Sequence, residues 1–408
     1  MARRRIVIAG TGQGGFQVAA SLRQEGFDGE IVMIGDESGL PYQRPPLSKA
    51  YVKEGRADRL LFRNADFFQT NAIAIEDGLR VEEIDRHARA VSFGGGRSIG
   101  YDHLVLALGA RNRRLPLPGI DLDGVLELRT MAHADAIRAA LPSAARIAVI
   151  GGGFIGLEIA ATASAAGAHV TVLEATHRLM SRVVSQPVSS FFLDAHAALG
   201  AEIRLEALAR RIVDDGHGRA AGVELDDGSR VDADLVLVSA GVLPNAELAE
   251  AAGLYVHDGI RVNDLLETED PAISAIGDCA SFPFGHDGVQ VRLESVQNAV
   301  DQAKCVARRL VGHPEPYRKV PWFWSDQGPH KLQMAGLTAG ADHHVARAAG
   351  EGKLSIFCFR RGDLVGVETV NVPGDHMAAR RLLARDTPLT LETVEAAGFD
   401  LPALMAAT

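Results

Sequence analysis

The chain contains little cysteine. Cys279, Cys305 and Cys358 are the three cysteines of the 408 residues, and no two of them form a C-x-x-C pair. Disulfide frameworks and structural zinc sites need several cysteines at regular spacing, so we expect neither and no metal site. Three unpaired thiols are typical of a reducing, cytoplasmic compartment.

The sequence also lacks an excess of positive charge and any long apolar run. Its formal net charge is −10, whereas general nucleic-acid affinity needs a basic surface. No run approaches the roughly 20 apolar residues that span a membrane, and the apolar stretch 6–9 is too short for a signal peptide. We therefore expect no nucleic-acid partner, no membrane association and a cytoplasmic protein.

Glycine, by contrast, is abundant, with 43 residues. The apolar run 5–9 predicts a buried parallel strand, and Gly10-x-Gly12-x-x-Gly15 follows it, opening a predicted helix over 14–26 and a second strand over 31–34. In such a loop the first glycine makes the turn, the second lets the backbone approach a pyrophosphate, and the third permits close packing of helix on strand.

The same pattern returns at Gly151-x-Gly153-x-x-Gly156, between a predicted strand at 146–150 and a predicted helix at 154–167, with another strand at 169–174. An internal duplication of this kind predicts two domains of one fold. Each loop would place a phosphate at a helix N-terminus, where free N–H groups and the helix dipole favour anions. The two units together predict two bound dinucleotides.

An acidic residue follows each loop by about 20 positions, Asp36 in the first unit and Glu174 in the second. A carboxylate at this place accepts the ribose hydroxyls and repels a 2′-phosphate. Glu174 therefore favours NADH over NADPH. Arg178 either softens that preference or is an ordinary surface arginine.

Further apolar segments complete the predicted fold. Strands at 101–110 and 233–241 each end in small residues and precede a proline, a short strand covers 272–278, and a helix covers 295–311. After Pro321 the composition changes, and 354–359 and 364–372 alternate as antiparallel strands do, with a helix at 375–384. We predict an α/β fold with two Rossmann-like dinucleotide-binding domains and a C-terminal α+β domain. The predicted bounds are 1–112 with 245–320, 113–244, and 321–408.

Residues 274–281, Ser-Ala-Ile-Gly-Asp-Cys-Ala-Ser, resemble the second FAD motif of the flavin disulfide reductases, a glutathione-reductase-like superfamily. In those folds the N-terminal unit holds FAD and the inserted unit holds NAD(P). The resemblance implies that Asp278 bonds the ribityl chain of FAD.

A closer resemblance rests on motifs that stand in order along nearly the whole chain: Pro41-Tyr42-Gln43-Arg44-Pro45-Pro46-Leu47-Ser48-Lys49, Leu128-Arg129-Thr130, Gly151-Gly152-Gly153-Phe154-Ile155-Gly156-Leu157-Glu158, Glu294-Ser295-Val296-Gln297-Asn298-Ala299 and Pro321-Trp322-Phe323-Trp324-Ser325-Asp326-Gln327. The chain resembles the NADH-dependent ferredoxin reductases of bacterial oxygenase systems, of the type of putidaredoxin reductase and the reductase components of biphenyl-type dioxygenases. One departure is Ala107-Leu108-Gly109, where the family often has Ala-Thr-Gly, so a hydroxyl near the flavin would be missing.

The resemblance implies two sets of site residues. The FAD set is Gly10, Gly12, Gly14, Gly15, Asp36, Arg44, Pro46, Lys49, Val81, Gly109, Arg129, Gly277, Asp278, Glu294, Val296 and Trp324. The NADH set is Gly151, Gly153, Ile155, Gly156, Glu158, Glu174 and Gly241.

Three of these residues are candidates for a part in catalysis: Lys49, Glu158 and Trp324. Lys49 follows a Pro-Pro pair that stiffens the chain, and an ammonium fixed beside flavin N5 would stabilise the charge that arrives with hydride. Glu158 is placed to pair with Lys49, although it could serve only as an acid in the first turns of a helix. We expect Trp322 and Trp324 to point to opposite faces of a strand, one toward the flavin and one into the core.

The resemblance implies that NADH gives hydride to FAD, and that single electrons then pass to a 2Fe–2S ferredoxin serving a haem monooxygenase or a Rieske dioxygenase. Because no cysteine precedes Cys279, no redox-active pair follows the first loop as it does in disulfide reductases, and electrons must leave through the flavin edge. Lys304, Arg308 and Arg309 share a predicted helix and are candidates for ferredoxin docking. They also suit a solvated helix face.

The oligomeric state stays open between a monomer and a weak homodimer. The alternatives on the same scaffold are a rubredoxin reductase, an NADH oxidase, or a non-enzymatic flavoprotein used for binding, of the type of apoptosis-inducing factor.

Overall fold

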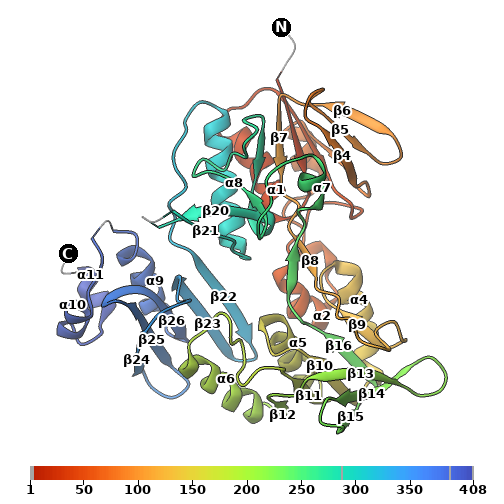
Figure 1. The fold of residues 1–408 in the computed structure, drawn as a ribbon, viewed down its shortest axis with the longest axis vertical. Helices are drawn as coiled ribbons and strands as arrows, with labels where there is room; N and C mark the ends of the chain where they lie inside the picture. Colours follow the sequence, from red (N-terminus) through yellow and green to blue (C-terminus); the bar gives the residue numbers. More distant parts are fainter. Residues whose placement is uncertain (1–3, 286–287, 386, 407–408) are drawn as a thin grey trace. The chain divides into compact units, whose positions relative to one another are not determined.

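The computed structural model describes residues 4–285, 288–385 and 387–406 and divides into two compact units (Figure 1). The first unit comprises Met1–Gln43, Ala57–Arg111 and Val242–Lys319, and the second comprises Arg44–Arg56, Asn112–Gly241 and Val320–Thr408. The short segment 44–56 thus groups with the second unit. The division into three domains stays a prediction.

The first unit is built on a five-stranded parallel sheet. Its strands are β1 (Arg5–Ala9), β2 (Glu30–Ile34), β3 (Ile73–Glu76), β7 (His103–Leu106) and β19 (Ile273–Ala275), in the order β19-β7-β1-β2-β3. This is the order of the dinucleotide-binding fold, in which ligands bind beyond the carboxyl ends of the strands. Helices α1 (Gln13–Gln24), α3 (Ala65–Thr70), α7 (Glu247–Ala251) and α8 (Val296–Leu310) belong to the same unit.

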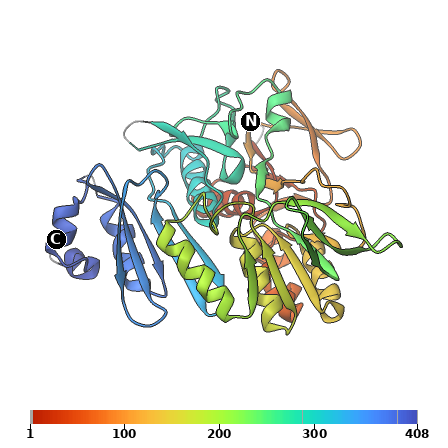
Figure 2. The same cartoon turned by 60° about the horizontal axis from the view of Figure 1, so that its bottom comes forward.

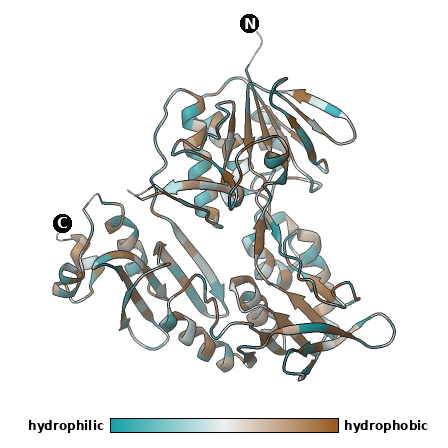
Figure 3. Ribbon diagram, in the orientation of Figure 1, coloured by the Kyte–Doolittle hydropathy of each residue, from teal (hydrophilic) through white to brown (hydrophobic). Residues whose placement is uncertain are grey.

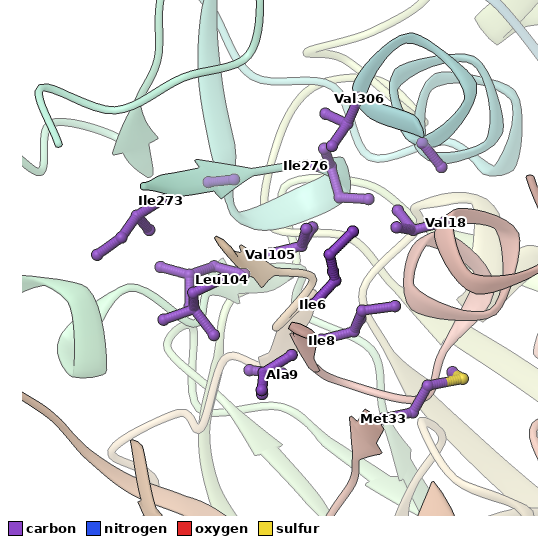
Figure 4. Close-up of a cluster of buried hydrophobic side chains, with 14 of the residues drawn as sticks. Ile6, Ile8, Ala9, Val18, Met33, Leu104, Val105, Ile273, Ile276 and Val306 are labelled. Carbon is purple, nitrogen blue, oxygen red and sulfur yellow. The ribbon is translucent and has the colours of Figure 1, made fainter. Parts of the chain in front are cut away.

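The core of the first unit lies between this sheet and two helices. Figure 4 shows Ile6, Ile8 and Ile276 beside Val18 of α1 and Val306 of α8, and all five side chains are buried. Ile6 and Ile8 share a face because alternate residues of a strand point the same way. Helices α1 and α8 pack against each other, so the phosphate loop before α1 is held by a buried helix pair.

Smaller sheets complete the first unit. Strands β4 (Val81–Asp85), β5 (Ala90–Phe93) and β6 (Arg97–Gly100) form an antiparallel meander, and β18 (Ile260–Arg261), β20 (Ala280–Phe284) and β21 (Val289–Val291) form another small sheet. Two short strands, β8 (Ala110–Asn112) and β17 (Val242–Pro244), lie where the chain passes between the units.

The second unit repeats the parallel architecture. Strands β9 (Val125–Glu127), β10 (Arg146–Ile150), β11 (His169–Leu173), β12 (Ala201–Arg204) and β16 (Leu235–Val238) pair in the order β12-β11-β10-β16-β9, with α2 (Ala50–Glu54), α4 (Met131–Ala140), α5 (Phe154–Ala165) and α6 (Gln186–Ala198) as helices. An antiparallel sheet of β13 (Ala209–Asp214), β14 (Ala220–Leu225) and β15 (Arg230–Asp232) is attached. The duplication predicted from the two glycine loops is confirmed.

The C-terminal part of the second unit is α+β, as predicted. Five strands form one antiparallel sheet, which belongs to the blue part of the ribbon in Figure 2. The strands are β22 (Trp322–Gln327), β23 (His330–Gly336), β24 (His343–Ala348), β25 (Leu354–Arg360) and β26 (Asp363–Val370), in the order β22-β23-β26-β25-β24, and the helices are α9 (Pro373–Leu382), α10 (Leu391–Ala396) and α11 (Leu401–Ala406).

The strands of both parallel sheets are mostly hydrophobic (Figure 3), as expected for sheets covered on both faces. Within the described residues, no helix combines the length and the apolar character that crossing a membrane would require.

Candidate functional site

The first glycine loop has the geometry of a phosphate cradle. Gly10 has φ +113°, and a Cβ there would lie 2.2 Å from the Ala107 carbonyl oxygen. A Cβ at Gly15 would lie 1.9 Å from the Gly10 oxygen, whereas no atom lies within 4 Å of a Cβ placed on Gly12. A side chain at the first or third glycine would therefore clash with the backbone, whereas the second glycine faces free space. The loop fits a bound pyrophosphate.

Three segments of the first unit meet at one edge of the sheet. Strands β1, β7 and β19 are neighbours, and the chain leaves them at Gly10, Ala107 and Ile276. The Ala107 amide donates to the Ala9 oxygen at 2.8 Å, and the Ile276 amide donates to the Leu106 oxygen at 3.0 Å. The carboxyl edge thus collects the glycine loop, the segment of Gly109 and the segment of Asp278.

The remaining FAD candidates of the first unit occupy varied places. Asp36 is exposed beyond β2, Val81 is buried in β4, and Val296 is the first residue of α8. Gly14, in the first turn of α1, lies beside Ile276, and exposed Glu294 pairs with Arg292 at 2.7 Å. Gly109 and Gly277 have φ of +63° and +73°. At the departure from Ala-Thr-Gly, Asn245 Nδ2 donates to the Leu108 oxygen at 2.9 Å, so the backbone there is held by another residue.

The second glycine loop reproduces the first. Gly151 has φ +110°, and its Cβ would lie 2.2 Å from the Ser239 oxygen. A Cβ on Gly156 would lie 2.2 Å from the Gly151 oxygen, and one on Gly153 would meet nothing within 4 Å. This loop also fits a pyrophosphate at the start of α5.

The carboxylate of Glu174 is fixed beside this loop. Its Oε2 accepts the Gly152 amide at 2.8 Å, and its Oε1 accepts both the amide and the hydroxyl of Thr176, each at 2.8 Å. A carboxylate held by backbone donors keeps one orientation, which suits an acceptor for ribose hydroxyls.

The guanidinium of Arg178 is occupied within the fold. It donates to the Val184 oxygen at 2.8 Å, to Ser189 Oγ at 2.9 Å and to the Ser181 oxygen at 2.5 Å. Arg178 is therefore more than a solvated surface arginine, and its effect on the preference for NADH stays a prediction.

A buried carboxylate, Glu158, forms the centre of a polar cluster in the second unit. Only 5% of its side chain is exposed, and Lys49 Nζ lies 3.0 Å from its Oε1. Ser48 Oγ donates to Oε2 at 2.5 Å, and Ser325 Oγ donates to Oε1 at 2.7 Å. The predicted pairing of Lys49 with Glu158 is confirmed. The residue is more than a helix-dipole acid, because three segments converge on it.

The ammonium of Lys49 lies between two carboxylates. Besides Glu158, it approaches Asp326 Oδ2 at 3.4 Å, and Asp326 Oδ1 in turn lies 3.4 Å from Lys331 Nζ. Exposure rises along this series, from 5% for Glu158 through 21% for Lys49 and 37% for Asp326 to 52% for Lys331. The two carboxylates hold the ammonium in place.

The prediction that Trp322 and Trp324 point to opposite faces is wrong. Their ring centroids are 5.5 Å apart, with the planes at 31°. Residues two apart on a strand share a face, and the ring of Phe323, the residue between them, instead lies 4.5 Å from the ring of Phe154 at a tilt of 37°. Trp322 packs under Arg380, whose guanidinium carbon is 4.3 Å from the ring centroid.

The other candidates of the second unit surround the same elements. Arg44 donates to the Arg129 oxygen at 2.6 Å, and Pro46 lies in the short 3-10 helix Pro45–Ser48. Ile155, in the first turn of α5, is 43% exposed, and Gly241 has φ +88°.

The proposed docking residues differ in their surroundings. Lys304 is exposed, and Arg308 pairs with Glu315 at 2.9 Å. Arg309 is only 10% exposed and lies 2.5 Å from both Glu267 Oε1 and Ser274 Oγ. Arg309 is thus bound inside the fold.

The sequence reasoning missed Ser48, Thr176, Ser325 and Asp326 as site residues. Each lies beside a residue that was named, and Ser48, Ser325 and Asp326 stand within quoted motifs. Neighbouring polar residues in a motif are therefore the signal that was available. In the described part of the chain, no three His, Cys, Asp or Glu side chains gather as metal ligands would.

Comparisons with known proteins find relatives that match nearly the whole chain. The family model "pyridine nucleotide-disulphide oxidoreductase" matches residues 4–303, and "reductase C-terminal" matches residues 322–405. Rhodocoxin reductase of Rhodococcus erythropolis is 51% identical over 97% of this chain and 93% of its own length. Putidaredoxin reductase of Pseudomonas putida is 38% identical over 95% and 93%.

Solved structures give the same result. The ferredoxin reductase for the CYP199A2 system of Rhodopseudomonas palustris has a TM-score of 0.95 at 48% identity, covering 98% of this chain and 99% of the other. The reductase in the covalent putidaredoxin reductase–putidaredoxin complex has a TM-score of 0.95 at 37% identity, covering 100% and 99%.

Proposed function

The chain belongs to the pyridine nucleotide-disulphide oxidoreductase family, among the ferredoxin reductases of oxygenase systems, and we propose that it transfers electrons from NADH through FAD to a 2Fe–2S ferredoxin. That ferredoxin would serve a haem monooxygenase or a Rieske dioxygenase. Bound FAD supplies the conversion of one hydride into two single electrons. The observation that carries the proposal is the pair of open glycine cradles, one in each unit.

The protein's own part is to bind and orient the two nucleotides. The first cradle and the carboxyl edge beside it would hold FAD, together with the other FAD residues named from the sequence. The second cradle would hold the pyrophosphate of NADH, while Glu174 accepts the ribose hydroxyls. No protein nucleophile is needed for hydride transfer, so positioning and electrostatics account for the rate.

Lys49 is the candidate for the electrostatic role. Its ammonium is held by the carboxylates of Glu158 and Asp326, so it presents a fixed positive charge that needs no rearrangement during the reaction. Glu158 positions Lys49 and is itself held by Ser48 and Ser325. Trp324 would lie beside the reacting rings.

The cysteines support an exit of electrons without a dithiol. Burial raises the pKa of the Cys279 thiol to about 11, and burial likewise raises the pKa of Cys305 to about 11. Burial also raises the pKa of Cys358. Thiols that stay protonated at neutral pH are poor redox relays. The three unpaired thiols also support a cytoplasmic location.

The docking proposal narrows to Lys304 and Arg308, because the side chain of Arg309 is largely buried and bonded to Glu267 and Ser274. A charge reversal such as Lys304→Glu should raise the KM for ferredoxin and reduce its dependence on salt, since surface charges steer association. An unchanged KM would place docking elsewhere.

We propose a monomer or a weak homodimer, which sedimentation at several concentrations would test.

The central experiment compares electron acceptors. The FAD-loaded enzyme is mixed with NADH in a stopped-flow instrument, and flavin absorbance is followed under anaerobic conditions, then with ferredoxin, with rubredoxin or with dioxygen alone. We expect rapid flavin reduction and turnover that depends on the 2Fe–2S ferredoxin. Equal turnover with dioxygen alone would identify an NADH oxidase, faster turnover with rubredoxin a rubredoxin reductase, and no flavin reduction a binding protein.

A further inference from the structure

A loop of the second unit, residues 174–185, joins β11 to α6 and lies against the second glycine cradle; we call it the adenosine loop. It begins at Glu174 and ends at Ser185, before α6 starts at Gln186. The amide of Met180 donates to the Gly152 oxygen at 3.0 Å, and Gly152 donates back to Glu174. The loop and the cradle are therefore fastened together at two points.

We propose that the adenosine loop selects NADH, with Glu174 as a fixed acceptor for the ribose hydroxyls and Arg178 as a positioning residue of the loop that does not bind a 2′-phosphate. This inference rests on the proposed function and deepens it. It names Thr176 as a determinant of coenzyme choice and Arg178 as a residue that holds the loop in place for either coenzyme.

The acceptor capacity of Glu174 is nearly filled by the protein. A carboxylate has about four acceptor sites, and three are taken by the Gly152 amide and by the amide and hydroxyl of Thr176. The remaining site, on Oε2, can accept a ribose hydroxyl. A 2′-phosphate is mostly dianionic at neutral pH, so it would bring negative charge and no donor to this carboxylate.

The bonds of Arg178 shape the loop from inside. Its guanidinium joins the Ser181 and Val184 oxygens to Ser189 Oγ in α6, and Ser189 Oγ donates to the Leu179 oxygen at 2.5 Å. If the guanidinium turned its NH1 and NH2 groups toward a phosphate, it would leave these three acceptors without a partner in a half-buried setting. Unpaired acceptors there are costly, and we therefore infer that Arg178 shapes the loop rather than binding the phosphate.

Thr176 links the two parts of this arrangement. Its hydroxyl lies 2.8 Å from Glu174 Oε1 and 2.9 Å from the Arg178 oxygen. A hydroxyl has one proton, and it fills the third acceptor site of Glu174 when it points to Oε1 rather than to the Arg178 oxygen. At the far end, Ser185 Oγ donates to buried Glu368 of β26 at 2.5 Å, so both ends of the loop are anchored.

The test measures equilibrium binding of NAD⁺ and NADP⁺ to the FAD-loaded enzyme by calorimetry, independently of ferredoxin. In Arg178→Ala we expect both affinities to fall by the same factor, roughly tenfold for bonds to a charged group, leaving the NAD⁺/NADP⁺ ratio unchanged. If only NADP⁺ affinity falls, Arg178 binds the phosphate and the inference is wrong. Unchanged affinity for both would also overturn it.

Arg178→Lys covers the case in which the alanine variant does not fold. A lysine keeps the charge but cannot join three acceptors, so both affinities should again fall together. If Arg178 instead bound the 2′-phosphate, the lysine variant would keep most of the NADP⁺ affinity of the wild-type enzyme.

Thr176 is tested by removing its hydroxyl at constant shape. Thr176→Val should lower NAD⁺ affinity several-fold and narrow the NAD⁺/NADP⁺ ratio, and Thr176→Ser should restore both. The matched control is His177→Ala, which changes an exposed residue of the same loop and should leave both affinities as they are. A Thr176→Val ratio equal to that of wild type would refute the role of Thr176.

Failure of the proposed function and failure of this inference give different experimental results. If the wild-type enzyme binds no NAD⁺, the proposed function itself fails. If it binds NAD⁺ and reduces ferredoxin, but Arg178→Ala loses NADP⁺ alone, only the inference about the adenosine loop fails.

Discussion

The two glycine cradles differ at a pair of positions that have exchanged their side chains. In the first unit Thr11 follows the first glycine and Gly35 follows β2, whereas the second unit has Gly152 and Glu174 at these places, as the strand pairings show. A Cβ on Gly35 would lie 2.1 Å from Thr11 Oγ1, and one on Gly152 would lie 3.0 Å from Glu174 Oε2. Each unit holds one side chain in the same space.

The consequence is that the two acids are placed differently. Glu174 folds back onto its own loop, while Asp36 stands one residue farther along and is exposed. The phosphate cradle is therefore common to both units, and the surroundings of the ribose are what distinguishes them. The duplicated fold supplies the binding of a dinucleotide, and a few side chains decide which one.

The largest expected effect comes from adding a methyl group to the first glycine of either loop. Gly151→Ala and Gly10→Ala would force a Cβ onto a carbonyl oxygen at a positive φ, at a cost on the order of 3 kcal/mol. We expect Gly151→Ala to abolish NAD⁺ binding with FAD retained, and Gly10→Ala to lose FAD. Flavin content and calorimetry measure the two outcomes.

The second glycine provides the matched control. Gly153→Ala meets no atom and has an ordinary φ of −84°, so the free energy of unfolding should change by less than about 1 kcal/mol. NAD⁺ affinity should nevertheless fall, because the methyl group occupies the space of the pyrophosphate. Unchanged affinity would show that this space is not the binding site.

The next effect concerns Glu158, whose counterpart in the first unit is the neutral Gln17. Glu158→Gln gives the second unit the residue of the first and removes the buried counterion of Lys49. We expect flavin reduction by NADH to slow by about tenfold or more, because the ammonium loses its fixed position. Stopped-flow rates measure this.

Asp326→Asn serves for comparison with Glu158→Gln. It removes the longer and more exposed of the two ion pairs of Lys49, so its effect should be smaller. Equal slowing by both substitutions would contradict the central place of Glu158.

A smaller effect is expected when one unit is given the loop residue of the other. Gly152→Thr places in the second unit the threonine of the first and should push Glu174 away from the loop, lowering NAD⁺ affinity roughly tenfold through the lost charged hydrogen bond. Thr11→Gly in the first unit should leave NAD⁺ affinity unchanged. Calorimetry measures the NAD⁺ affinity of both variants. If Gly152→Thr keeps the wild-type affinity, the hydrogen bond from the Gly152 amide to Glu174 is not required for NAD⁺ binding.

The smallest effects are on stability against pH, and they have opposite signs in the two units. Burial, helped by Arg309 and Arg4, lowers the pKa of His103 in the first unit to about 3. The unfolded chain therefore binds more protons below the usual histidine pKa of 6.5, and stability is lost as the pH falls from there toward 3. His103→Gln should flatten this acid limb of the stability curve, because the substitution removes the titrating group.

In the second unit, burial raises the pKa of Glu368 above its usual 4.5, although Ser185 bonds oppose the shift. The stability contributed by this carboxyl group is present below pH 4.5 and is lost as the pH rises through the raised value. Glu368→Gln should flatten the corresponding limb of the stability curve at higher pH. Thermal melts across pH test both substitutions, and parallel curves for variant and wild type would refute either assignment.

Local patterns predicted much of the fold. The strand at 5–9 matches β1 in its bounds, and the helix predicted over 295–311 is α8 within a residue at each end. The alternation of side chains along a strand also specifies which face of the sheet a residue occupies. The expectation for Trp322 and Trp324 was wrong because that period was misapplied, not because the fold overrode it.

The candidate site was predicted less completely. The pairing of Lys49 with Glu158 followed from the resemblance, but Ser48 and Ser325 did not, because serine is common and carries no spacing signal. The burial of Arg309 was also unforeseen, since its partners Glu267 and Ser274 lie far away in the sequence.

The sequence by itself determined the duplicated dinucleotide fold, its two cradles and the acids beside them, because glycine loops after apolar strands impose backbone geometry locally. Only the tertiary structure decided which charged and polar side chains surround these features. It closed Arg178 into the adenosine loop and surrounded Glu158 with residues 48–49 and 325–326. Electrostatic surroundings depend on burial and on distant partners, and neither is written in the spacing of residues along the chain.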